Sequence, residues 1–312
     1  MRWSISSHRT FRRCQRQYFF GSIAANHKTK DRIRREAYLL KQVKQLSTWK
    51  GSIIHQGIHK FVVPYLVERK RIDWPAVSDK TLDLAKRQFA FSKALKYRQP
   101  GVAKSHHDDY CILTEHDRGK DVPAEKIDEI YNEVVGCLNS PAFQKEIIPF
   151  VEGQKGYYSE KNLSQKYEDA QISAVADLIF TRLSGNVVIV DWKYEQDYSF
   201  GDHSHQVALY GWVLKHQWNI LKPELIELYE VQLREGRIVQ HNFNTLVMEE
   251  LEDFMFQSIH EIRSLCEDHK YETQNIEDFE FAKSGNSCIY CSFVKLCREV
   301  KQWEPTSSIF SS

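Results

Sequence analysis

The feature that most constrains the fold is a pair of apolar segments joined by a short turn. The segments are QISAVADLIF (171–180) and NVVIVDWKY (186–194), and SGN (184–186) forms the turn before the second segment. Both are rich in β-branched residues, and a turn signal separates them, which is typical of two strands in a β-hairpin. The sequence therefore predicts paired strands at about 171–181 and 186–194.

Each of these strands carries one aspartate, and the hairpin is expected to place the two side by side. Side chains alternate between the faces of a strand, so Asp191 and Lys193 share one face. If the turn is centred on Ser184, Asp177 of the first strand lies directly opposite Asp191. Cross-strand partners have Cβ atoms about 4.5–5.5 Å apart, and like charges there are destabilising. We therefore expect either a cation between the carboxylates or a proton on one of them.

A hard divalent ion such as Mg²⁺ fits this pair, because it prefers oxygen ligands and keeps several waters. Lys193 would then orient or activate an attacking water, and an incoming phosphate would complete the coordination. The alternative is that Asp177 and Asp191 only cap strand ends near solvent. The matched register, together with Lys193, favours the functional interpretation.

The order of the remaining elements predicts an α/β fold. Helical periodicity covers residues 4–20, 33–46, 51–70, 76–97, 121–138, 204–217 and 245–268. Strand patterns cover residues 156–163, 171–181, 186–194, 224–233 and 237–243. The core order is thus α, β, β, β, α, β, β, with a helical insertion at about 64–150 and a loop-like stretch at 100–120 within it. Such an order predicts a mixed sheet flanked by helices.

Other polar residues are candidates for the same site. Gln206 and Tyr210 lie one helical turn apart and share a face of helix 204–217, although core packing explains Tyr210 equally well. His55 follows Gly51 in a G-x3-H pattern, on an apolar helix where a single histidine is more often a core residue. We expect the ligand-rich clusters SHHDDY (105–110) and GDHSH (201–205) to be solvated loops.

Three cysteines occupy ten positions in CIYCSFVKLC (288–297), within a chain that has seven. The C-x2-C-x5-C spacing indicates a metal site, but three thiolates are one short of a closed set. An iron–sulfur cluster is favoured over zinc, because zinc sites more often pair two C-x2-C knuckles. The odd and uneven cysteine count suits a reducing cytoplasm better than a disulfide framework. Three cysteines are expected to be ordinary thiols: Cys111, Cys137 and Cys266.

Positive charge is concentrated in the first fifty residues. They hold thirteen Lys and Arg against Asp31 and Glu36, a net charge of +11 in a chain whose net charge is +1. A basic segment with interleaved aromatic residues is typical of a surface that binds phosphates and stacks bases, although a solvated helix face fits as well. The chain has no apolar run long enough for a membrane span and no signal-peptide pattern, so we expect a cytoplasmic protein.

In this order, G-x3-H (51–55), Asp177, D-x-K (191–193) and Q-x3-Y (206–210) resemble the RecB-like branch of the PD-(D/E)XK nuclease superfamily. A cysteine near the N-terminus plus a C-terminal C-x2-C-x5-C resembles the iron–sulfur group of that branch, which includes CRISPR-associated RecB-like exonucleases and the AddB nuclease domain. The resemblance covers residues 4–297 except the insertion, and it implies a restriction-endonuclease-like core. Ala174, Gln15 and Tyr194 depart from the residues common at these positions.

The resemblance also implies roles for individual residues. His55, Asp177 and Asp191 would hold Mg²⁺ or Mn²⁺ with a main-chain carbonyl, that of Trp192, and Lys193 would act on the attacking water. Gln206 and Tyr210 would position Lys193 or the DNA strand. The four ligands of a [4Fe–4S] cluster would be Cys14, Cys288, Cys291 and Cys297. The residues expected to contact DNA are Arg9, Arg12, Arg13, Arg16 and Tyr18.

The resulting prediction is one RecB-like nuclease domain over residues 1–312, with a cysteine segment at 280–303 joined to Cys14 through the cluster. It would be a Mg²⁺- or Mn²⁺-dependent deoxyribonuclease, with single-stranded DNA exonuclease activity in repair, recombination or CRISPR and phage defence. The chain has no P-loop motif, so any unwinding would need a separate helicase among its CRISPR or repair partners. Two alternatives are a non-catalytic DNA-binding or assembly subunit and a zinc protein without nuclease chemistry.

Overall fold

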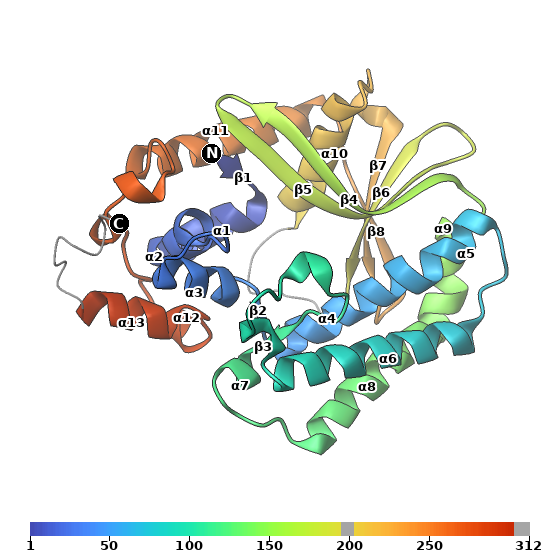
Figure 1. The fold of residues 1–312 in the computed structure, drawn as a ribbon. Helices are drawn as coiled ribbons and strands as arrows, with labels where there is room; N and C mark the ends of the chain where they lie inside the picture. Colours follow the sequence, from blue (N-terminus) through green and yellow to red (C-terminus); the bar gives the residue numbers. More distant parts are fainter. Residues whose placement is uncertain (195–202, 303–312) are drawn as a thin grey trace. The chain divides into compact units, whose positions relative to one another are not determined.

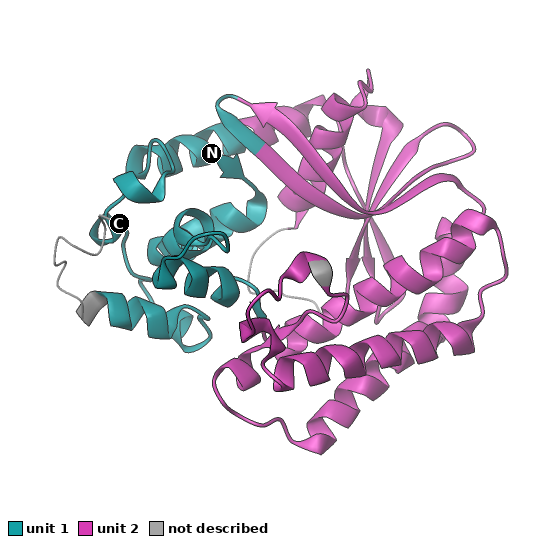
Figure 2. Ribbon diagram, viewed as in Figure 1, with its two compact units in different colours: residues 1–43, 168–171, 254–312 teal, residues 44–167, 172–253 magenta. Residues whose placement is uncertain are grey.

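The structure is a computed structural model that describes residues 1–194 and 203–302 (Figure 1). It divides into two compact units (Figure 2). Unit 1 comprises residues 1–43, 168–171 and 254–312, and unit 2 comprises residues 44–167 and 172–253. Within the described residues, no helix is long and apolar enough to cross a membrane.

A mixed six-stranded sheet has the order β1-β5-β6-β7-β8, with β4 also pairing with β5. Its strands are β1 (Arg2–Trp3), β4 (Lys155–Tyr167), β5 (Ala170–Thr181), β6 (Val187–Lys193), β7 (Ile226–Gln232) and β8 (Arg237–His241). The β5/β6 and β7/β8 pairs are antiparallel, whereas β6 and β7 are parallel. Parallel neighbours need a long crossover connection, which here contains helix α10 (Ser204–Gln217). The predicted α/β, restriction-endonuclease-like fold is confirmed.

The β5/β6 hairpin has the predicted register. Leu178 pairs with Val190 and Thr181 pairs with Val187, and the turn is closed by a 2.8 Å hydrogen bond from Arg182 N to Asn186 O. The paired residues end at Leu178 and Val190, and the next residue on each strand is an aspartate, Asp177 and Asp191. The turn position was sufficient to predict the pairing, because the register of a hairpin is fixed by the length and type of its turn.

One face of the sheet forms the main core of unit 2. Leu178, Phe180, Val188, Val190 and Trp192 are buried there against apolar residues of the surrounding helices. Helices α4, α6 and α8 lie against this core, and α10 lies against the other side of the sheet (Figure 1). The helices are α4 (Leu46–Gly57), α5 (Val63–Glu68), α6 (Trp74–Lys93), α7 (Thr114–Asp117), α8 (Ala124–Asn139) and α9 (Ile148–Val151).

Two local features depart from the expected helices and loops of unit 2. The expected helix 51–70 is one run of helical turns, but a π-helical segment, Ile58–Val62, separates α4 from α5, and Pro64 lies in the first turn of α5. The proline, which has no N–H to donate, lies just after the π-helical segment, where the regular α-helical hydrogen-bond pattern is already interrupted. The expected loop 100–120 contains short elements, β3 (Ile112–Leu113) and α7.

Unit 1 is helical. Its helices are α1 (Ile5–Arg13), α2 (Gln15–Tyr18), α3 (Arg32–Leu40), most of α11 (Thr245–Leu265), α12 (Asn286–Ile289) and α13 (Val294–Gln302). The helix predicted at 4–20 is capped by Ser4, whose side chain accepts from Ser7 N, and it is interrupted at Cys14. Cys14 has extended backbone angles, so its side chain caps the start of α2. Residue 303 of the expected cysteine segment lies outside the described residues.

Candidate active site and metal centre

The carboxylate of Asp177 is fixed by the neighbouring strand. The main-chain N–H of Trp192 donates a 2.7 Å hydrogen bond to Asp177 Oδ2. The other oxygen, Oδ1, lies 3.5 Å from Nδ1 of His55 on α4. One oxygen of Asp177 is therefore held by strand β6, and the other faces a side chain that ligates metals well.

Asp191 is buried at the end of β6, with 2% of its surface exposed. Its Oδ1 accepts hydrogen bonds from Gln206 Nε2 at 3.3 Å and from the Tyr210 hydroxyl at 3.2 Å. Gln206 Nε2 also donates to the Tyr210 hydroxyl at 2.6 Å. The other carboxylate oxygen of Asp191, Oδ2, forms an ion pair with Lys193 Nζ at 2.6 Å. The structure thus brings the Q-x3-Y pair of α10 onto the D-x-K strand end.

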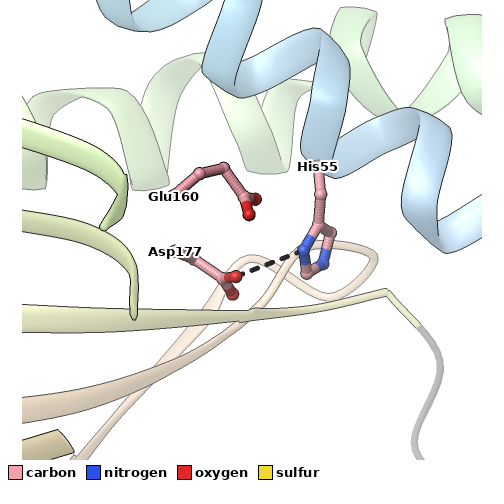
Figure 3. Close-up of side chains that lie close together, drawn as sticks. All are labelled: His55, Glu160 and Asp177. Carbon is pink, nitrogen blue, oxygen red and sulfur yellow. Dashed lines mark ion pairs between the residues drawn. The ribbon is translucent and has the colours of Figure 1, made fainter. Parts of the chain in front are cut away.

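A third carboxylate joins the site. His55, Glu160 and Asp177 each offer a ligand atom, and these atoms lie within 4.8 Å of one another (Figure 3). The sequence predicted a set of His55, Asp177 and Asp191, whereas the compact group contains Glu160. Glu160 was missed because it lies in a strand whose pattern gives no sign of a bend.

Glu160 has an unusual backbone conformation. Its φ is +50° within β4, in the left-handed region that non-glycine residues rarely adopt. The preceding residue is anchored, because Ser159 Oγ lies 2.5 Å from Nδ1 of His59. A strained backbone conformation persists only where the surrounding structure holds it, and residues of this kind cluster at functional sites. The distortion interrupts the alternation of β4 and directs the Glu160 carboxylate toward His55 and Asp177 (Figure 3).

The electrostatics of the site are those of crowded negative charge. Burial raises the pKa of Asp191, and the charge of Asp177 raises it further against the opposing effect of Lys193. Burial and Asp177 also raise the pKa of Glu160. Burial alone would lower the pKa of His55, but the carboxylates of Asp177, Asp191 and Glu160 together outweigh it and the net pKa is raised. For Asp191 and Glu160 burial is the larger cause and the charge of Asp177 adds to it, whereas the raised pKa of His55 comes from the neighbouring carboxylates.

These groups line a cleft of about 760 Å³. His55, Glu160, Asp177, Trp192 and Lys193 contribute to its wall. The remaining lining residues come mainly from the first turns of α4 and include Ser47, Thr48, Gly51 and Ser52. The carboxylates of Glu160 and Asp177, the imidazole of His55 and the ammonium group of Lys193 therefore line one cleft.

The donor set fits a divalent cation. Two carboxylates and one imidazole each offer a ligand atom, and these atoms lie within 4.8 Å of one another. Oxygen-rich sets suit Mg²⁺ and Mn²⁺. His55, Glu160 and Asp177 would hold such an ion. Nothing in the structure tests the Trp192 carbonyl as a ligand.

A mixed sheet thus presents D-x-K at one strand end, beside a group of two carboxylates and one imidazole that could bind a divalent ion. The chain belongs to the PD-(D/E)XK nuclease superfamily, whose family profile matches residues 2–298. This membership supports a nuclease.

Comparisons with individual proteins add less. No curated protein sequence matches the chain. Among solved structures, one described as "Crystal structure of SSO0001" is similar to it, with 15% sequence identity and a TM-score of 0.29. The match covers 70% of this chain and 84% of the other.

The four cysteines of the expected cluster all lie in unit 1. Cys14 separates α1 from α2, Cys288 lies in α12, Cys291 follows it, and Cys297 lies in α13. None is in a disulfide. Burial raises the pKa of Cys297 to about 11, and Cys14, Cys291 and Cys288 also act on it electrostatically, so the four thiols share one neighbourhood. Cys111, Cys137 and Cys266 are buried thiols, as expected.

Two of the expected DNA contacts are wrong. Arg16 is 2% exposed, and its guanidinium donates to Phe279 O at 3.1 Å and to Glu277 at 2.7 Å. Tyr18 is 0% exposed and packs edge-on against Phe11, which is also buried. Both side chains stabilise the interior of unit 1, so neither is available to a nucleic acid. Arg12 and Arg13 are exposed and Arg9 is half-buried.

The expectation of a solvated loop at 201–205 is also corrected in part. Residues 201 and 202 lie outside the described residues, but His203 is the N-cap residue of α10 and contacts Glu230. His205 lies in the first turn of the same helix.

Proposed function

We propose that this protein is a Mg²⁺- or Mn²⁺-dependent deoxyribonuclease. The observation that carries the proposal is the register-matched pair Asp177 and Asp191, with Lys193 Nζ 2.6 Å from Asp191 and His55 and Glu160 grouped around Asp177. Membership of the PD-(D/E)XK nuclease superfamily supports the same chemistry.

In the proposed reaction, each residue has a defined task. His55, Glu160 and Asp177 would hold a divalent ion, which would supply Lewis-acid stabilisation of the developing phosphate charge. Lys193, held by Asp191 at the edge of the cleft, orients the attacking water and places its ammonium charge beside the scissile phosphate.

Three hydrogen bonds, two to Asp191 and one to Asp177, keep these groups in place. Gln206 and Tyr210 hold Asp191 Oδ1 by hydrogen bonds, which leaves Oδ2 for the lysine. The Trp192 N–H holds Asp177 so that its other oxygen stays near His55. None of these contacts involves a reacting atom, so we assign these residues to positioning.

We further propose that the substrate is single-stranded DNA degraded from an end, in repair, recombination or CRISPR and phage defence, with a separate helicase as a partner. The exposed Arg12 and Arg13 of unit 1 are candidates for contacts with the strand. Contacts of this kind weaken steeply with salt.

The test is digestion of end-labelled linear and circular DNA, single-stranded and duplex, by wild type and by Asp191→Ala. Wild type is expected to release nucleotides from linear single strands with Mg²⁺ or Mn²⁺ and to be inactive in a chelator. Equal rates for wild type and Asp191→Ala would overturn the catalytic assignment and leave a DNA-binding or assembly subunit. Cleavage of circular substrates would overturn the exonuclease assignment alone.

For unit 1 we propose a [4Fe–4S] cluster held by Cys14, Cys288, Cys291 and Cys297. The thiols are free and partly buried, and Arg13 and Arg16 act electrostatically on members of the set, which suits a cluster with net negative charge. Protein purified without oxygen is expected to be brown and to contain iron and acid-labile sulfide. Colourless protein with one zinc ion per chain would replace the cluster with a zinc site.

A further inference from the structure

The strand that carries Lys193 is followed by a tyrosine whose side chain reaches a helix of the insertion. Tyr194 comes directly after Lys193, and its hydroxyl donates a 3.2 Å hydrogen bond to Glu133 Oε2 on α8. Lys50 Nζ on α4 donates to the same carboxylate oxygen at 2.5 Å. The Lys50 ammonium group also lies over the Tyr194 ring, 5.1 Å from its centroid. Side chains from two helices and a strand end therefore contact one another.

The protonation states of these groups suit their contacts. The hydrogen bond from Lys50 lowers the pKa of Glu133, so the carboxylate is ionised and accepts both donors. Burial raises the pKa of Tyr194 to about 12, so its phenol stays protonated and donates. Lys50 is 9% exposed, and a buried ammonium group needs a charge partner. Glu133 thus serves Lys50 and Tyr194 at once.

These contacts border the nuclease cleft. Tyr194 and Lys193 both line it. Lys193 is the last residue of β6, and its main-chain carbonyl accepts a 2.8 Å hydrogen bond from Leu233 N, directly after β7. Main-chain pairing therefore holds Lys193 from the side of β7, while Glu133 fixes the side chain of the next residue. Since consecutive Cα atoms are about 3.8 Å apart, a shift of Tyr194 would move Lys193 as well.

The position of Lys193 matters for the proposed reaction. Its ammonium group pairs with Asp191 at 2.6 Å and would lie beside the scissile phosphate. A misplacement of about 1 Å in a catalytic group can cost about 100-fold in rate, even when the change lies away from the reacting atoms. Contacts that fix the end of β6 therefore bear on catalysis.

We propose that Glu133 is a positioning residue for Lys193. It receives the Tyr194 hydroxyl, Lys50 keeps it ionised, and the resulting contacts hold the end of β6 at the cleft. Glu133 lies on α8, so the helical insertion contributes to the geometry of the active site as well as to the core. The catalytic consequence rests on the proposed nuclease function, whereas the hold on the strand end is measurable without activity.

The first measurement is amide hydrogen exchange of Leu233, followed by NMR of ¹⁵N-leucine-labelled full chain in a chelator. Tyr194→Phe keeps the ring and loses the hydroxyl that Glu133 accepts. Exchange of Leu233 is expected to be about fivefold faster in this variant, the factor that corresponds to one typical hydrogen bond. Leu228, within β7, is expected to exchange at the wild-type rate. Equal exchange of Leu233 in the two proteins would overturn the proposal, as would faster exchange at both leucines.

The second measurement is a double-mutant cycle in turnover. Tyr194→Phe is expected to lower kcat by about 10- to 100-fold and to leave KM and the affinity for Mn²⁺ unchanged. In the Lys193→Met background the same substitution is expected to cause no further loss, because it acts through the lysine. An equal fold-loss in both backgrounds would overturn the proposal.

The variants on α8 complete the design. Lys50→Met/Glu133→Leu removes both charges together, so no buried charge is left unpaired, and it is expected to match Tyr194→Phe in kcat. Wild-type kcat in this double variant would overturn the role of Glu133. Glu129→Gln is the matched control: it removes an exposed ion pair with Lys126 on the same helix and is expected to leave kcat unchanged. If wild type cleaves no DNA, the proposed function fails, and the exchange of Leu233 alone decides whether the strand end is held.

Discussion

Lys193 Nζ lies 2.6 Å from Asp191 Oδ2 and forms an ion pair with this buried carboxylate. The opposite oxygen is occupied by Gln206 and Tyr210. The lysine is therefore held by an ion pair on a buried carboxylate, with 20% of its side chain exposed toward solvent. A charge held in this way is pre-organised for a phosphate that enters the cleft.

Substitution of Lys193 separates catalysis from metal binding. Lys193→Met is expected to lower kcat by about 100- to 1,000-fold, the usual effect of losing one electrostatic donor in a hydrolytic site. Its affinity for Mn²⁺ should be retained, because the ammonium group is not a ligand and its removal leaves the site more negative. Turnover and Mn²⁺ titration of the same sample measure both quantities. Loss of Mn²⁺ binding in Lys193→Met would mean that the lysine acts only by shaping Asp191.

Asp177→Asn is expected to stabilise the metal-free protein while it abolishes activity. Asp177 lies opposite Asp191 and close to Glu160, and like charges at cross-strand positions cost up to about 1 kcal/mol. An asparagine Oδ1 still accepts the Trp192 N–H. In a chelator, the melting temperature should rise by roughly 2–4 °C. Mn²⁺ should raise the melting temperature of wild type more than that of Asp177→Asn. A lower melting temperature for the variant in the chelator would contradict the repulsion argument.

Glu160 allows a test of backbone strain. At its φ of +50°, a side chain with a Cβ costs about 1 kcal/mol relative to glycine. Glu160→Gly is therefore expected to be more stable than Glu160→Ala by about 1 kcal/mol in urea unfolding, although glycine normally weakens a strand. Both variants lose the carboxylate and should bind Mn²⁺ less tightly than wild type. Equal stability of the two variants would show that the distortion relaxes when the carboxylate is removed.

The contrast between Asp177 and Glu160 shows how far the sequence could predict this site. The hairpin register followed from side-chain alternation and one turn, because both strands are regular there. Glu160 could not be found in that way, since its left-handed backbone breaks the alternation and depends on a tertiary contact between Ser159 and His59.

The basic N-terminal segment was harder to interpret for a related reason. Alternating arginines and aromatic residues describe a stacking surface for DNA and also the buried face of a helix. Arg16 and Tyr18 are buried and therefore belong to the interior face of a helix. Only the acceptors for Arg16, the carbonyl of Phe279 and the carboxylate of Glu277, explain how a guanidinium is buried there, and both lie more than 250 residues away in sequence.

The pH dependence of stability should differ between the metal-free and metal-bound protein. The raised pKa of Asp191 means that the metal-free fold loses stability as pH rises from the ordinary carboxyl pKa of about 3.9 through the folded-state value. The raised pKa of His55 acts in the same direction, since its stabilising charge is lost as pH rises from about 6.5 through its folded value.

A divalent ion reverses this trend, because it needs deprotonated ligands. The rise in melting temperature on addition of Mn²⁺ is therefore expected to be larger at about pH 8 than at about pH 5.5. Calorimetry at both values, with and without the ion, measures it. In the chelator, the comparison is with Asp191→Asn. The melting temperature of wild type should lie below that of Asp191→Asn at high pH, and this difference should shrink as pH falls. If the difference in melting temperature between the two proteins is constant over this range, titration of Asp191 is not its cause.

Removal of Cys14 tests the link between the two ends of the sequence in unit 1. Cys14→Ser is expected to lose iron and acid-labile sulfide and to lower the unfolding temperature of unit 1, because a cluster that joins position 14 to positions 288–297 closes a very long loop. Cys266→Ala is the matched control. Its thiol is buried in the same unit and donates to Ile262 O at 3.2 Å, so its loss should leave a small cavity and an intact cluster. Full iron content in Cys14→Ser would assign the fourth ligand to another residue. Equal iron loss in Cys14→Ser and Cys266→Ala would mean that the cluster depends on the packing of unit 1 and would identify no particular thiol as a ligand.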